Sequence, residues 1–342
     1  MVKIAFFELE GWEKNILKKQ LANHKLLFFN EPLNEKNILQ IKDAQIIGIF
    51  IYSKITKKEL DVLKNLKMIA TFSTGFDHID IAECTKRKIV VCNVPSYGSH
   101  TVAEHTLALM LGVAKKIIPS VDRTRAGNFS LEGLRTIDIY GKTLGLIGFG
   151  KIGSHVAKVC RSLGMNVIVY DPYADENLVD LLDCKKVSLE YLLKHSDIIS
   201  LHAPLTPQTH HIINKDTIKQ MKNGVILINT ARGALVDTKA LLDAILSKKI
   251  AGAGLDVLEE ENAIREEKEL LSLDYPKKHD LHTVVITHML REHQNVIITP
   301  HNAFNSVEAL ERIVYTSAEN ILEYLKKTPK NIVNKEVLNK KI

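Results

Sequence analysis

Three polar residues in the 342-residue sequence follow predicted strands and together could carry out acid–base chemistry at a carbonyl group. Arg232 offers a planar fork of donors that can bind a carboxylate and polarise an adjacent carbonyl. His301 can exchange a proton near neutral pH, and Glu261 could orient its ring and favour its charged form. These are the protein groups that reduction of a 2-keto acid by a hydride donor needs: a carboxylate anchor, a proton donor and a tuner for that donor. Each alone has a plainer interpretation, because such an arginine is usually ion-paired and a run of three glutamates is usually solvated.

The segment that ends at Asp171 has the pattern of a dinucleotide-binding unit: strand, G-x-G-x-x-G turn, helix and second strand. Gly148 allows the tight turn, Gly150 lets the backbone approach a pyrophosphate, and Gly153 lets helix and strand pack closely. The helix N-terminus favours the diphosphate, and Asp171 can accept hydrogen bonds from the adenosine ribose. A 2′-phosphate would meet like charge at Asp171. The pattern therefore indicates NAD rather than NADP, although an isolated glycine motif would indicate only a loop.

Strands and helices alternate along most of the chain, which predicts an α/β fold with parallel sheets. In the second part of the chain, successive strands end at Asp171, His202, Arg232 and Asp256. Because the carboxyl ends of parallel strands meet at one edge of a sheet, we expect these residues to converge on one crevice. In the first part, the N–H groups of the turn at 73–77 could hold a carboxylate, although an ordinary strand-to-helix turn is equally consistent.

Composition excludes several classes of function. The net charge of +6 comes from scattered lysines, without the basic run and interleaved aromatics of a nucleic-acid groove. No apolar run approaches the roughly 18 residues of a membrane span, and Val2–Leu9 alternates like a strand rather than a leader. Four widely spaced cysteines indicate reduced, buried thiols. We therefore expect a cytoplasmic enzyme with a small-molecule substrate and neither a membrane nor a nucleic-acid partner.

Two stretches depart from the regular alternation. Residues 119–141 have no clear period, and we interpret them as a connection to the glycine turn. Residues 259–295 are charged and contain four histidines, but the loose spacing favours a surface excursion or subunit contact over a metal site. His100 and His105 also lack the H-E-x-x-H spacing of a zinc site. We expect no metal.

Five motifs, GFGKIG, HAPLTPQT, NTARGALVD, GAGLDVLEEE and ITPHNAF, occur in an order that resembles the D-isomer-specific 2-hydroxyacid dehydrogenase family. The resemblance covers nearly the whole chain. It implies two Rossmann-like or flavodoxin-like, doubly wound parallel-sheet domains with a cleft between them. An NAD-binding domain, 97–302, would be inserted into a catalytic domain built from 1–96 and 303–342, usually in a homodimer.

The resemblance also implies roles for individual residues. Arg232, Glu261 and His301 would be the catalytic set, and Thr74 and Gly75 would donate N–H groups to the substrate carboxylate. The glycine turn, the strand ends and the matched motifs together give a set of expected cofactor contacts: Gly148, Gly150, Lys151, Ile152, Gly153, Asp171, His202, Ala203, Pro204, Thr209, Thr230, Ala231, Arg232 and Asp256.

Within this family the chain looks most like the D-lactate dehydrogenase branch, in which aromatics similar to Tyr52, Tyr97 and Phe304 border the pocket for the substrate side chain. It departs where 98–100 replaces the usual Ser-Pro and where Asn305 replaces an aromatic. The expectation is NADH-dependent reduction of pyruvate to D-lactate. The alternatives are an enzyme for glyoxylate, hydroxypyruvate, 3-phosphoglycerate or phosphite, and an NAD(H)-sensing, corepressor-like binding protein.

Overall fold

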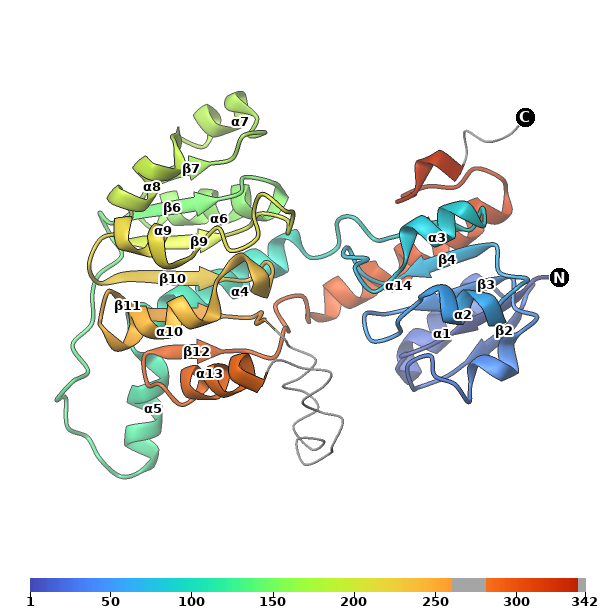
Figure 1. The fold of residues 1–342 in the computed structure, drawn as a ribbon, viewed down its shortest axis with the longest axis horizontal. Coiled ribbons are helices and arrows are strands. Elements are labelled where there is room, and N and C mark those ends of the chain that lie inside the picture. The colour runs from blue at the N-terminus through green and yellow to red at the C-terminus, as the bar shows by residue number, and fades with distance from the viewer. Residues whose placement is uncertain (260–280, 338–342) are drawn as a thin grey trace. The chain divides into compact units, whose positions relative to one another are not determined.

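The computed structural model describes residues 1–259 and 281–337 and divides into two compact units (Figure 1). The smaller unit combines Met1–Gly98 with Asn305–Ile342, and the larger unit is Ser99–Phe304. The expected range of 97–302 differs from that of the larger unit by two residues at each end. Each unit is described by itself below.

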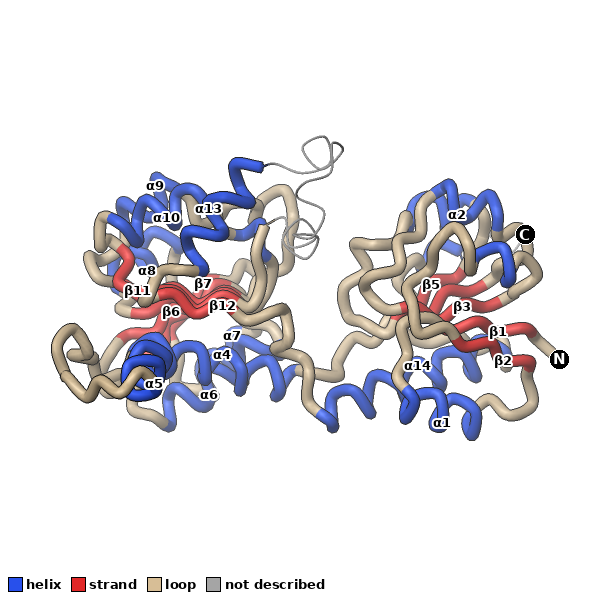
Figure 2. Tube along the Cα trace, turned by 90° about the horizontal axis from the view of Figure 1, so that it is seen from below, coloured by secondary structure: helices blue, strands red, loops and turns tan. Residues whose placement is uncertain are grey.

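The smaller unit is built on a five-stranded parallel sheet with the order β2-β1-β3-β4-β5. The strands are β1 (Lys3–Phe6), β2 (Lys25–Phe28), β3 (Ile46–Ile49), β4 (Met68–Thr71) and β5 (Val90–Cys92). Their apolar runs suit a sheet that is covered on both faces. Figure 2 shows α1 (Gly11–Gln20) and α14 (Val307–Leu325) on one face and α2 (Lys57–Val62) on the other, where α3 (Ile81–Lys86) also packs.

The C-terminal segment completes the smaller unit through one buried side chain. Asn334 Oδ1 accepts a hydrogen bond from the Val91 N–H (2.9 Å), and Asn334 Nδ2 donates to the Ile89 carbonyl (2.9 Å). The same Nδ2 also donates to Thr85 Oγ1 (3.2 Å). Asn334 thereby supplies partners to the backbone of edge strand β5, which would otherwise be buried without them. Chain segments from opposite ends of the sequence therefore form one domain.

The larger unit contains a seven-stranded parallel sheet with the order β12-β11-β10-β9-β6-β7-β8. Its strands are β6 (Thr143–Ile147), β7 (Asn166–Tyr170), β8 (Lys185–Lys186), β9 (Ile198–Leu201), β10 (Val225–Asn229), β11 (Ile250–Leu255) and β12 (Val296–Ile298). The chain moves outward in one direction through β7 and β8 and then returns to place β9 on the other side of β6. This reversal creates a topological switch point between β6 and β9.

Helices cover both faces of this sheet (Figure 2). One face carries α8 (Leu189–His195), α9 (Lys215–Gln220), α10 (Thr238–Leu246) and α13 (Leu281–Arg291), and the other carries α4 (Ser99–Ala114), α6 (Lys151–Ser162) and α7 (Glu176–Leu181). Two separate apolar cores result. Helix α4 lies wholly within the larger unit. The expected doubly wound fold is confirmed.

Two local expectations are wrong. The stretch 119–141 does not begin as a connection, because α5 (Ile117–Arg125) includes its first residues. This helix has no buried residue, and its apolar residues Ile117, Ile118 and Val121 are exposed instead of packed in the core. The stretch 259–295 is not entirely an excursion, because Ile286 and Leu290 of α13 are buried in the core of the larger unit. Residues 260–280 lie outside the described part.

Within residues 1–259 and 281–337, no helix is long and apolar enough to cross a membrane. The same residues contain no group of three or more potential metal-binding side chains. All four cysteines are unpaired, as expected, and three of them are buried. Burial raises the pKa of Cys84, Cys92 and Cys160 to about 12, which makes these thiols poor nucleophiles.

Asn334→Ala should lower the free energy of unfolding by about 2–4 kcal/mol, because it leaves buried groups of β5 without hydrogen-bond partners. Urea unfolding followed by circular dichroism will measure the loss. Lys335→Ala, at the exposed next position, is the matched control and should leave the transition unchanged. Equal transitions for both variants would contradict the role of Asn334 in joining the two chain segments.

Candidate active site

The glycine turn after β6 is shaped by close packing at two glycines and by open space at the third. Gly148 has a φ of +98°, and a Cβ there would lie 2.5 Å from the His202 carbonyl carbon. A Cβ on Gly153 would lie 2.4 Å from the Gly148 oxygen. A Cβ on Gly150, by contrast, would have no neighbour within 4 Å. The turn is thus tight at the switch point and open at Gly150, as a bound pyrophosphate requires.

The residues around this turn provide a matched set of donors and acceptors for a dinucleotide. Helix α6 begins at Lys151, and its N-cap, Gly150, makes no side-chain capping bond. The carboxylate of Asp171, after β7, accepts hydrogen bonds from the Phe149 N–H (2.7 Å) and the Tyr173 N–H (2.8 Å). A phosphate suits the helix terminus, and a ribose diol suits the nearby carboxylate. The structure therefore brings together the turn and the acidic residue expected from the sequence.

The loop after β9 lies on the other side of the switch point. His202 Nε2 is 2.9 Å from Ser200 Oγ, and burial lowers the pKa of His202 to about 4, so the imidazole is neutral at physiological pH. Thr209 Oγ1 donates to the Pro204 carbonyl (2.6 Å) and closes the loop. The buried Ala203 contacts the glycine turn closely, since a Cβ on Gly148 would also collide with its nitrogen.

Arg232 stands on a turn after β10 that a buried amide holds. Asn229 Nδ2 donates to the Arg232 carbonyl (2.8 Å), and Asn229 Oδ1 accepts from the Ala231 N–H (3.0 Å). The hydroxyls of Thr230 and Thr106 lie 2.8 Å apart, which connects the turn to α4. The guanidinium donates from Nη1 to the Ala231 carbonyl (2.7 Å). Backbone bonds thus fix the base of the Arg232 side chain.

His301 stands on the loop after β12, which a buried carboxylate holds. Asp256, at the end of β11, accepts hydrogen bonds from Thr299 Oγ1 (2.6 Å) and from the N–H groups of Asn302 and Ala303 (both 3.0 Å). His301 itself has a φ of +54°, which is uncommon for a residue other than glycine. These hydrogen bonds indicate that Asp256 positions the loop that carries His301. A direct contact with the cofactor stays a prediction.

Electrostatics favour the charged form of Asp256. Burial acts to raise its pKa, but hydrogen bonds from His105, Thr299 and two backbone groups outweigh burial and lower the pKa of Asp256. His105 Nε2 lies 3.0 Å from Thr299 Oγ1 and 3.4 Å from the carboxylate. Sequence reasoning considered His105 only as a metal ligand and missed this contact, which joins residues almost two hundred positions apart.

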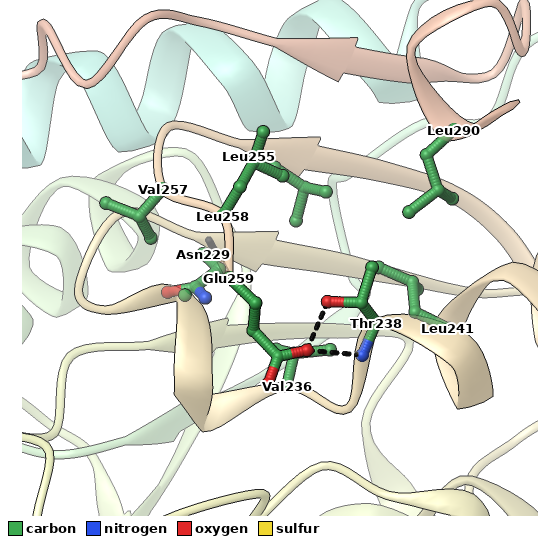
Figure 3. Close-up of a pocket in the computed structure, with 10 residues that line it drawn as sticks. Asn229, Val236, Thr238, Leu241, Leu255, Val257, Leu258, Glu259 and Leu290 are labelled. Atoms are coloured by element: carbon green, nitrogen blue, oxygen red, sulfur yellow. Dashed lines mark hydrogen bonds between the residues drawn. The ribbon is translucent and has the colours of Figure 1, made fainter. Parts of the chain in front are cut away.

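A second carboxylate, that of Glu259 just after β11, bonds to Thr238 at the start of α10 (Figure 3). Glu259 accepts hydrogen bonds from the N–H (3.0 Å) and hydroxyl of Thr238, and lies 2.6 Å from His211 Nε2. A side chain on Gly233 would collide with the backbone just before Glu259. The run of three glutamates is therefore not simply solvated at its first member. Glu261, two residues further along, lies outside the described residues.

The smaller unit contains the turn expected to bind a substrate carboxylate. Ser73 Oγ donates to the Gly75 carbonyl (2.6 Å) and lies 2.7 Å from Thr71 Oγ1. Thr74 Oγ1 donates to the Val94 carbonyl (2.7 Å). His78 Nε2 lies 3.2 Å from Thr71 Oγ1, and burial lowers the pKa of His78 to about 4. A neutral histidine and buried hydroxyls thus shape the turn, a role that the sequence did not reveal.

The three aromatic residues expected at the substrate side chain occupy different units. Tyr52, after β3, is 48% exposed, and Tyr97 accepts a hydrogen bond at its carbonyl from Arg312 Nε (2.7 Å). Both residues belong to the smaller unit, and Phe304 is the last residue of the larger one. Their contact with substrate stays a prediction.

The doubly wound sheet, the glycine turn and Asp171 define a dinucleotide-binding protein. A model for the NAD binding domain of D-isomer specific 2-hydroxyacid dehydrogenases matches residues 107–303. The chain thus belongs to the D-isomer specific 2-hydroxyacid dehydrogenase family, and NAD is its cofactor. The resemblance seen in the sequence is confirmed.

Similarity to individual relatives extends over most of both chains. The chain is 35% identical to the D-lactate dehydrogenase of Escherichia coli, with 94% of this chain and 96% of the relative covered. It is 36% identical to the glyoxylate reductase of Thermofilum pendens, with coverage of 90% and 86%. A solved structure of the Aquifex aeolicus D-lactate dehydrogenase with NAD and lactic acid has a TM-score of 0.86, 36% identity, and coverage of 97% and 99%. The relatives thus share the family but differ in substrate.

Gly150→Ala should weaken NADH binding at least about tenfold without loss of stability, because the added methyl meets open space in the protein but enters the path of the pyrophosphate. Gly153→Ala is the comparison. Its methyl meets the Gly148 oxygen, so it should also lower the free energy of unfolding by about 1–3 kcal/mol. Fluorescence titration and thermal unfolding will separate the two effects. Unchanged NADH affinity in Gly150→Ala would remove this turn from the cofactor site.

Proposed function

We propose that this protein reduces a short 2-keto acid reversibly with NADH, pyruvate first, and forms the D-2-hydroxy acid, here D-lactate. One observation carries the proposal: Arg232 and His301 stand at the carboxyl ends of β10 and β12, on either side of β11. Asn229 and Asp256 hold these two loops in place. This arrangement supports Arg232 as a carboxylate anchor and His301 as a proton donor in the NAD-binding domain. Similarity to D-lactate dehydrogenases supports pyruvate as the substrate.

In the proposed reaction, bound NADH supplies a hydride to the keto carbon. Arg232 binds the carboxylate of the substrate and stabilises the negative charge that develops on the carbonyl oxygen. His301 donates a proton to that oxygen, and Glu261 favours the protonated imidazole in the reductive direction. In the smaller unit, Thr74 and Gly75 provide N–H groups for the carboxylate. Tyr52, Tyr97 and Phe304 border the substrate side chain.

The same proposal assigns the cofactor contacts. The glycine turn and the start of α6 hold the pyrophosphate, and Asp171 binds the adenosine ribose. The loops after β9 and β10 line the remainder of the dinucleotide. The remaining proposed contacts are His202, Ala203, Pro204, Thr209, Thr230, Ala231, Arg232 and Asp256.

Glyoxylate reduction is the second candidate function, because glyoxylate reductases are as similar to the chain as D-lactate dehydrogenase is. Purified protein will be mixed with NADH and with pyruvate, longer 2-keto acids, glyoxylate or hydroxypyruvate, and absorbance at the nicotinamide band followed. We expect pyruvate to give the highest kcat/KM, and in the reverse direction D-lactate but not L-lactate should be oxidised. A preference for glyoxylate would replace the substrate but keep the chemistry.

The proton donor is tested by His301→Ala, which should lower kcat about 10²- to 10⁴-fold while NADH binding is retained. His293→Ala, a histidine in the turn before β12, is the matched control and should keep wild-type kcat. Near-native turnover by His301→Ala would show that another group protonates the product. No turnover by the wild-type protein on any 2-keto acid, with NADH still bound, would favour a sensing role.

We further propose that the protein acts in the cytoplasm as a homodimer. The arm formed by residues 117–140 carries apolar side chains that its own unit leaves exposed, and Figure 1 shows its helix α5 outside the layers of the sheet. Phe129, Leu131 and Tyr140 are each about 80% exposed. Contiguous apolar exposure of this kind marks an interface, and a second copy of the chain is the proposed partner. The four unpaired cysteines suit a reducing compartment.

Ile118→Glu combined with Leu131→Glu should convert the dimer to a monomer, because burying two carboxylates at an apolar interface costs several kcal/mol. Sedimentation velocity will measure the assembly state. Leu181→Glu, at a position on α7 that is also 79% exposed, is the control and should leave the dimer intact. A dimer that survives the double substitution would locate the interface elsewhere.

A further inference from the structure

The proposed reaction does not use the largely buried carboxylate of Glu8. Glu8 follows β1, and its side chain reaches the turn after β3, residues 50–53. Glu8 Oε2 accepts hydrogen bonds from the Phe50 N–H (2.7 Å) and the Ser53 hydroxyl (2.9 Å), and Oε1 accepts from the Tyr52 N–H (2.8 Å). Converging backbone N–H groups of this kind form an anion-binding concavity. Here a side chain of the protein occupies it.

The position of this concavity in the fold is informative. In the order β2-β1-β3-β4-β5, the chain reverses direction between β1 and β3. Open α/β sheets bind ligands outside the carboxyl ends of the strands at such a switch point. The adjacent strand, β4, ends at the turn that carries Thr74 and Gly75. A binding site for an anion thus lies next to the turn proposed for the substrate carboxylate, and Glu8 fills it.

Glu8 is kept there despite two unfavourable features. Its φ is +62°, in the left-handed region that disfavours residues other than glycine and asparagine. Burial raises the pKa of the Glu8 carboxyl, an effect that the hydrogen bonds from residues 50–53 oppose. The surrounding hydrogen bonds therefore hold Glu8 in a backbone conformation and a buried environment that are each unfavourable. Such local strain concentrates at functional sites.

The carboxylate also determines where Tyr52 lies. Ser53 is fully buried, and its Oγ both donates to Glu8 and accepts a hydrogen bond from the Leu33 N–H (2.9 Å). The turn is therefore held from two sides. The Phe50 and Tyr52 rings meet edge to face at 6.0 Å, which further restricts the tyrosine. A change at Glu8 should consequently alter the surface next to the substrate side chain without touching the catalytic groups of the larger unit.

We propose that Glu8 is a specificity-determining positioning residue that restricts the substrate to 2-keto acids with a single anionic group. This inference rests on the proposed function, since it assumes that Tyr52 borders the substrate side chain. A second carboxylate on the substrate would meet the like charge of Glu8 and donors that Glu8 already engages.

The test compares pyruvate with oxaloacetate, which is pyruvate with a carboxylate on its methyl carbon. Glu8→Gly releases the N–H groups of Phe50 and Tyr52 from the carboxylate, and glycine suits the positive φ, so the variant should fold. The ratio of kcat/KM for oxaloacetate to that for pyruvate should rise at least about tenfold, mainly through a lower KM for oxaloacetate. Glu8→Gln removes the charge but still fills the concavity, so its ratio should rise less.

Controls separate specificity from stability. Glu35→Gln removes an exposed carboxylate of the same unit that pairs with Lys58, and should leave the ratio unchanged. Thermal unfolding and NADH titration of each variant will report its folding. An unchanged ratio in Glu8→Gly, or an equal fall in activity on both substrates together with a lower Tm, would overturn the proposal and leave Glu8 a structural role. Equal rises in Glu8→Gly and Glu8→Gln would overturn the part assigned to the N–H groups.

Failure of the proposed function has a different signature. It would appear in the wild-type protein as the absence of pyruvate reduction, whatever residue stands at position 8. Equilibrium binding of pyruvate and oxaloacetate to the NADH-loaded wild-type and Glu8→Gly proteins keeps the specificity test available in that case. The ratio of the two dissociation constants should shift toward oxaloacetate in the variant, and an unchanged ratio would again overturn the role of Glu8.

Discussion

Hydrogen bonds from loop N–H groups to buried acceptor side chains are the interaction on which both units depend. A parallel strand that leaves its sheet enters a loop whose backbone groups have no partners in the ladder, and buried groups of this kind require some other partner. Asp256 supplies it to the loop after β12, Asn229 to the turn after β10, and Glu8 to the turn after β3. These three side chains come from strand ends or from just beyond them. The loops at the carboxyl ends of the strands are therefore held in place by side chains from those same strand ends.

This arrangement has a consequence for reactivity. A carboxylate that accepts several hydrogen bonds in a region of low dielectric stays charged and holds its donors firmly, as the lowered pKa of Asp256 illustrates. The backbones of the loop with His301 and of the turn with Arg232 are thus held in place, which limits where the two side chains proposed for catalysis can lie. In the proposed reaction, such pre-organisation would lower the barrier.

The sequence predicted more of the fold than of these supports, for a physical reason. Apolar runs and the G-x-G-x-x-G turn depend on neighbours in sequence, and the strands they predicted are present. The two-residue strand β8, Lys185–Lys186, contains no apolar residue, so no local pattern marked it. The contacts of His105 with Thr299 and of Glu259 with His211 join distant segments. Those residues come together only in the folded chain. The local sequence does not distinguish them from other histidines and glutamates.

The residues proposed for acid–base chemistry and those proposed to border the substrate lie in different units. This separation gives a reason why members of one family can act on different acids. The groups proposed for hydride and proton transfer lie in the larger unit, on loops whose supports extend into its own core. Tyr52 and the turn at 73–77 lie in the smaller unit, and their supports, Glu8 and His78, are local to it. With the roles proposed above, substitutions in one set of supports would change the preferred acid while the other set keeps the acid–base groups in place. Relatives of nearly equal similarity that act as D-lactate dehydrogenase and glyoxylate reductase are the outcome that such independence allows.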